Sequence, residues 1–84
     1  MGEFAAPQRL TLAEANAFLD RARESLRAGE RTIDLSACRT VDSSALAVLL
    51  ELNRQAAPQR LTFSNPSDNL RKLADLYGVT DLLF

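Results

Sequence analysis

The sequence lacks the residues on which most enzymes and metal sites depend. Among its 84 residues there is no histidine and no tryptophan, and Lys72 is the single lysine. General acid–base catalysis uses histidine most often, and a nucleophilic side chain needs a nearby base to activate it. The three glycines cannot form a phosphate-binding loop, and no EF-hand spacing is present. We therefore expect a protein with no catalytic residues, no metal and no cofactor.

Cysteine and long apolar runs are also scarce. Cys38 is the only cysteine, so no intramolecular disulfide can form and nothing indicates an oxidising compartment. We expect Cys38 to be a small buried side chain. The longest apolar run, from Ala45 to Leu50, is far too short to span a bilayer, and the N-terminus has no apolar signal core. These features favour a cytoplasmic location without direct membrane insertion.

Charge of one sign is not concentrated in any part of the chain. Ten basic and eleven acidic residues leave a net charge of −1, and the arginines are scattered from Arg9 to Arg71. Nucleic-acid binding would need a clustered basic face, so we expect no nucleic-acid partner. The hydrophobic share of 46% is that of an ordinary globular protein. We expect a single domain over residues 1–84, with residues 1–8 disordered or left from cloning.

Helix signals recur along the chain. Thr11 and Glu14 form a capping-box pattern, which predicts a helix from Leu12 to about Ala28. Residues 42–44 offer cap oxygens to a second helix that begins at residue 45 and ends near residues 53–55.

A third helix is predicted after Asn65, its expected cap, with Pro66 at the first helical position and Gly78 as its end. Residues 79–84 are predicted to form a short apolar turn that packs on the core. Strands are predicted at 32–36 and 60–63, and residues 9–11 are a weak candidate strand. Helices that alternate with short strands predict an α/β domain with a mixed, mainly parallel sheet whose central strand is 32–36.

Two further features of the sequence bear on the interpretation. The segment Ala45 to Leu50 is apolar without a break, so the second helix must be covered on more than one side, and we expect a partner to cover the second side.

The seven residues 5–11 recur as 56–62. Their flanks do not match, so this is not a solenoid repeat, and the identity has no physical explanation.

Two segments carry a resemblance to a known family. Thr32-Ile-Asp-Leu-Ser36 is followed after a short loop by Val41-Asp-Ser-Ser-Ala-Leu46, and this pattern resembles STAS domains. That fold is shared by anti-sigma factor antagonists and the cytoplasmic tails of sulfate transporters. The segment Leu73-Ala-Asp-Leu-Tyr-Gly-Val79 is similar to one branch, the STAS subunit of the bacterial Mla phospholipid-transport ABC system. The resemblance covers roughly residues 10–84.

The resemblance implies a small STAS-like fold and a partner-binding site at the start of the second helix. STAS domains usually begin with a two-strand hairpin, and here the first strand looks missing or vestigial. The sheet edge left open would favour self-association into a homodimer. Ala45 also stands where many antagonists have glycine. The residues implied in partner binding are Thr40, Asp42, Ser43, Ser44, Ala45 and Val48.

Ser43 can be interpreted in three ways. In the anti-sigma branch the matching serine is the phosphorylation switch, and in the transporter branch the matching hydroxyl lies in the ATPase-binding surface. A helix N-terminus favours an anion, although Asp42 would repel a phosphoryl group. The third interpretation is that Asp42, Ser43 and Ser44 only cap the helix.

The first hypothesis for function is therefore a non-catalytic accessory subunit of a phospholipid-transport ABC transporter that maintains outer-membrane lipid asymmetry. Such a subunit would bind the ATPase subunit and stabilise or activate it, and the ATPase would bring it to the inner membrane. The alternative is an anti-sigma factor antagonist that is phosphorylated at Ser43 and binds an anti-sigma factor serine kinase. An enzyme is poorly supported by the residues present.

Overall fold

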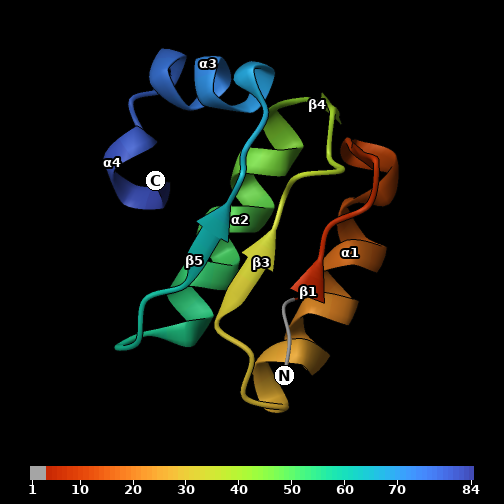
Figure 1. Ribbon diagram of the computed structural model, residues 1–84, viewed down its shortest axis with the longest axis vertical. Coiled ribbons are helices and arrows are strands. Elements are labelled where there is room, and N and C mark those ends of the chain that lie inside the picture. The colour runs from red at the N-terminus through yellow and green to blue at the C-terminus, as the bar shows by residue number, and fades with distance from the viewer. Residues whose placement is uncertain (1–3) are drawn as a thin grey trace.

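The computed structural model describes residues 4–84 and contains a small parallel sheet with helices α1 (Leu12–Arg27) and α2 (Ser43–Ala56) behind it in the view of Figure 1. Strands β1 (Phe4–Ala5), β3 (Thr32–Asp34) and β5 (Thr62–Ser64) lie in the order β1-β3-β5. Both described strand pairs in this sheet are parallel. The central position predicted for the 32–36 segment is confirmed.

The first strand is present, although it is only two residues long. Phe4 is in register with Ile33, and the Ala6 N–H donates to the Asp34 carbonyl at 2.9 Å. The Phe4 ring also lies 5.7 Å from the ring of Phe18. The expectation of disorder over residues 1–8 is therefore wrong from Phe4 onward, because a backbone ladder and an aromatic contact hold this segment. The remainder of that expectation, residues 1–3, lies outside the described residues.

A second, two-stranded sheet joins the starts of the first two helices. Strand β2 (Arg9–Leu10) pairs in parallel with β4 (Thr40–Val41). The weak candidate strand at 9–11 is therefore a strand. The pairing places Leu10, which is fully buried, beside Val41, and it brings the residues just before α1 next to those just before α2.

Helix α1 begins as predicted. The Thr11 N–H donates to the Glu14 carboxylate at 2.9 Å, and the capping box is formed. Hydrogen bonds from the Thr11 hydroxyl and N–H lower the pKa of Glu14. At the other end Gly29 has a φ of 99°, a left-handed conformation that glycine adopts without steric cost.

Helix α2 is buried by the domain itself. Five of its apolar side chains are at most 7% exposed, and α2 packs against α1, α3 (Asp68–Leu76) and α4 (Thr80–Leu83). The expectation that a partner covers the second side of α2 is therefore wrong, because α3 and α4 supply the cover. The buried residues of α2 are Ala45, Leu46, Val48, Leu49 and Leu52.

The C-terminal third departs from the sequence prediction in two places. The cap of α3 is Ser67, whose hydroxyl oxygen accepts the Leu70 N–H at 3.2 Å. Asn65 instead has a φ of 57°, a left-handed conformation that asparagine tolerates better than most residues. Its side chain donates to the Asp34 carboxylate at 3.2 Å. The expected terminal turn is a fourth helix, α4, which places Leu83 in the core.

Candidate functional site

The loops that leave the carboxyl ends of β3 and β5 lead to α2 and α3 at one edge of the molecule, the upper edge in Figure 1. The start of α1 lies at the same edge. In open parallel sheets, ligand sites form at the carboxyl ends of the strands, where helix N-termini gather. Five of the six residues implicated by the resemblance lie where β4 leads into α2 at this edge: Thr40, Asp42, Ser43, Ser44 and Ala45.

Asp42 is bonded to both helices. Its Oδ1 accepts the N–H of Ser44 at 2.9 Å and caps α2. Its Oδ2 accepts the N–H of Leu12, the first residue of α1, at 3.2 Å. The N-termini of two helices therefore share one carboxylate, which holds them together.

Ser43 is the first residue of α2, and its side chain is exposed. Asp42 supplies the cap, so the Ser43 hydroxyl is not needed for it. Thr40 is exposed in β4, and Ser44 is half-buried with its N–H committed to Asp42. An open hydroxyl at a fixed helix N-terminus can donate to or accept from a partner.

Two of the implied contact residues are not at the surface. Ala45 is fully buried and Val48 is 7% exposed, and both belong to the hydrophobic core. Their inclusion in the binding surface is therefore corrected: within the folded domain they fix the position of α2, and only Thr40, Asp42, Ser43 and Ser44 of the six reach its surface.

Apolar side chains that the sequence did not single out lie beside this site. Leu12 is 76% exposed although it continues the apolar spacing of α1, so the sequence carries no sign of its exposure. On the other side, a groove of about 340 Å³ is lined by Val41, Asn69, Lys72, Leu73 and Leu76.

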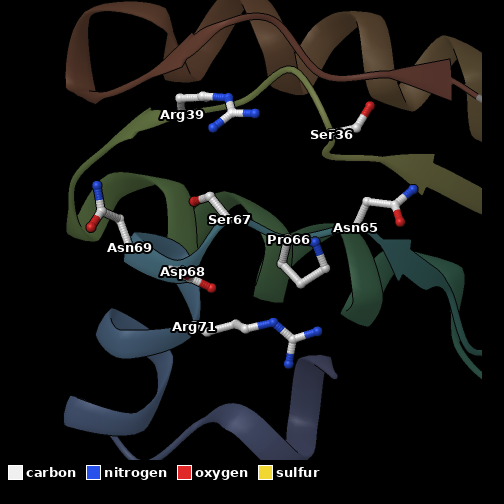
Figure 2. Close-up of a pocket in the computed structure, with 8 residues that line it drawn as sticks. All are labelled: Ser36, Arg39, Asn65, Pro66, Ser67, Asp68, Asn69 and Arg71. Carbon is white, nitrogen blue, oxygen red and sulfur yellow. The ribbon is translucent and has the colours of Figure 1, made fainter.

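A polar cleft of about 700 Å³ lies between the loop after β3 and the start of α3. Figure 2 shows Arg39 and Arg71 on opposite sides of it, with Asp68 between them. At its edge, hydrogen bonds from Asn65 and Ser36 lower the pKa of Asp34. The cleft is open and mixed in charge, and its remaining lining residues are Ser36, Asn65, Pro66, Ser67 and Asn69.

The remaining chemical features concern metal ligands, the cysteine and the hydrophobicity of the helices. Residues 4–84 contain no group of three or more potential metal ligands. Cys38 is fully buried as predicted, and burial raises the pKa of its thiol. No helix among these residues has both the length and the hydrophobicity that crossing a bilayer requires.

The short parallel sheet, the helices behind it and the exposed serine at the start of α2 together define a small α/β domain of the STAS class. The chain matches the family model described as "Mlab, STAS domain" over residues 7–84, and it belongs to this family. The match confirms the resemblance carried by the 32–36, 41–46 and 73–79 segments. Among curated proteins, none matches the chain.

Proposed function

We propose that this chain is a non-catalytic accessory subunit of a phospholipid-transport ABC transporter. It binds the ATPase subunit through the N-terminal end of α2 and stabilises or activates it, and this partner brings it to the inner membrane. The family match to an Mlab-type STAS domain over residues 7–84 is the observation that carries the proposal. Such a subunit acts by binding its partner and needs no general acid or base, which agrees with a sequence that has no histidine.

The geometry of the candidate site supports a binding role. Ser43 is exposed on a helix that the core holds in place, and Asp42 fixes the start of that helix through two hydrogen bonds. A surface that is already ordered loses little conformational entropy when a partner binds. Such a surface suits a permanent subunit contact.

A second candidate is an anti-sigma factor antagonist that is switched by phosphorylation of Ser43. The exposed hydroxyl favours it, since a kinase needs access to the oxygen and a helix N-terminus stabilises added negative charge. The neighbouring Asp42 carboxylate opposes it by repulsion. Because both Asp42 oxygens already accept backbone N–H groups, Asp42 cannot turn away without uncapping a helix.

Isolation of the chain from its native cell with its bound partner distinguishes the two candidates. The proposal expects an ABC ATPase, and purified ATPase subunit should then titrate with the chain by calorimetry. Capture of a serine kinase with no ATPase would favour the antagonist. Failure of the purified ATPase subunit to bind the wild-type chain would contradict the proposal.

A further inference from the structure

The groove beside β4 has an apolar floor that nothing in the domain covers. Val41 and Leu73 are half-buried in it, and Leu76 is 74% exposed. We call this feature, lined by Val41, Asn69, Lys72, Leu73 and Leu76, the α3 groove. One exposed leucine is ordinary on a protein surface, but Leu76 adjoins Val41 and Leu73 around one hollow.

The α3 groove is continuous with the site at Ser43. Val41 immediately precedes Asp42, the cap of α2. On the other side of that cap lies Leu12, whose N–H donates to the same carboxylate and whose side chain is 76% exposed. Apolar surface therefore flanks the start of α2 on both sides, and a partner seated on Ser43 would reach it.

The residues that line the groove and the adjoining cleft carry three cations, Lys72, Arg39 and Arg71, and one carboxylate, Asp68. Lys72 lines the groove itself, and Asn69 lines both the groove and the adjoining cleft, which contains Arg39 and Arg71. Within residues 4–84, none of these three cations is in an ion pair, whereas Arg23, Arg27 and Arg54 each are. Unpaired cations beside an apolar hollow match a partner surface with carboxylates around an apolar side chain.

We propose that the α3 groove is a second contact for the protein that binds at Ser43. The partner fills it with an apolar side chain flanked by aspartate or glutamate, and Lys72 pairs with one of those carboxylates. This inference rests on the proposed function, since the partner is the ATPase subunit. To the proposed function it adds the chemistry of the partner: the ATPase surface must present an apolar side chain flanked by carboxylates.

The test is calorimetric titration of the purified ATPase subunit with full-length variants at two salt concentrations. Leu76→Glu places an unpaired charge against the apolar contact and should weaken binding by about tenfold or more. Lys72→Glu should weaken it by a few fold to about tenfold and reduce the salt dependence of the affinity.

Two matched controls carry the same changes elsewhere. Leu82→Glu alters an exposed leucine of α4, and Arg21→Glu reverses an exposed cation of α1. Both should bind within about twofold of the wild type, because a surface charge outside the interface changes affinity little. Circular dichroism of each variant establishes that the fold is kept.

The results distinguish a failure of the groove inference from a failure of the proposed function. If the wild type binds the ATPase and Leu76→Glu binds equally well, the groove inference is overturned while the proposed function stands. If Leu76→Glu changes only self-association in sedimentation experiments, the groove is a contact between copies and the inference is also overturned. If the wild type does not bind the ATPase at all, the proposed function itself fails.

Discussion

The carboxylate of Asp42 accepts a hydrogen bond from the backbone N–H of Leu12, 30 positions earlier in the chain, at 3.2 Å. Its other oxygen caps its own helix through Ser44. One side chain thus satisfies an otherwise unpaired N–H at the start of each of two helices. The start of α1 and the start of α2 are therefore linked by Asp42.

Asp42→Ala should destabilise the domain by about 1–3 kcal/mol. The loss of an N-cap alone costs about 0.5–2 kcal/mol, and here the Leu12 N–H also loses its acceptor. Urea unfolding followed by circular dichroism measures the change. Asp68→Ala is the matched control, because Asp68 lies in the first turn of α3 and its carboxylate makes no hydrogen bond among residues 4–84. Equal stability of the wild type and Asp42→Ala would show that Asp42 does not hold these helix starts.

Ser43→Glu should separate stability from binding. The negative charge at a helix N-terminus contributes about 0.3–1 kcal/mol, so the melting temperature should stay the same or rise slightly. Binding to the ATPase should be lost, because an unpaired charge at an interface costs several kcal/mol. Calorimetric titration alongside melting curves measures both. If Ser43→Glu bound the ATPase with wild-type affinity, Ser43 would face solvent in the complex and would not belong to the binding site.

Ser43→Ala distinguishes the two functional hypotheses. A subunit contact would weaken by about 0.5–1.5 kcal/mol, which is the usual contribution of one hydrogen bond. An antagonist would keep its affinity and lose only the phosphorylation by its kinase. Titration of the alanine variant, together with a radiolabelled phosphate transfer assay, measures these two results independently.

Glu51 should contribute to the acid sensitivity of the domain. Hydrogen bonds from Arg54 and then Gln55 lower the pKa of Glu51 from 4.5 to about 2. A carboxyl group with a depressed pKa in the folded state stabilises it fully above the unfolded pKa, and this contribution is lost as the pH falls through the folded pKa. Stability should therefore fall between about pH 4.5 and pH 2.

Glu51→Gln should flatten that fall, since it removes the titrating group. The urea midpoint measured at several pH values from neutral to about 2 tests this against the wild type. Glu30→Gln serves as the control, because Glu30 makes no side-chain hydrogen bond among residues 4–84. An identical pH profile for the wild type and Glu51→Gln would show that the Glu51–Arg54 pair is too exposed to matter.

The free edge of β1 should allow weak self-association when the partner is absent. Because the Ala6 N–H bonds to β3, the alternating pattern of a parallel ladder directs the backbone groups of Ala5 outward. Ala5→Pro removes the outward N–H and spares the ladder, so it should reduce a concentration-dependent dimer seen by light scattering. A wild type that stays monomeric at high concentration would contradict the prediction.

Local signals predicted the helices and strands well, and the exceptions have physical causes. The Thr11–Glu14 pair specified the start of α1, because a capping box acts over three residues. The start of α3 was misplaced because Asn65 and Ser67 are both good caps. The choice between them depends on the left-handed backbone of Asn65, which is stabilised by Asp34 on another strand.

The site was predicted in part for a similar reason. Ser43 follows from the motif, and the structure places it on the surface. Ala45 and Val48 were included wrongly, because an unbroken apolar run does not reveal which neighbours cover each side. The α3 groove was not predicted, since Val41 and Leu76 come from separate elements that only the fold brings together.

The amide of Asn53 in α2 binds two later parts of the chain at once. Its oxygen accepts the Leu61 N–H at 3.2 Å, and its nitrogen donates to the Leu82 carbonyl at 3.1 Å. Aspartate would keep the acceptor and bring a carboxylate against a carbonyl oxygen. Leucine would remove both hydrogen bonds, and the Leu82 carbonyl would keep only the 3.5 Å hydrogen bond from Arg60. Glutamine has both polarities but one methylene too many for the same spacing. One planar amide therefore ties α4 and the entry to β5 to the same point of α2, and few substitutions at residue 53 would keep both hydrogen bonds.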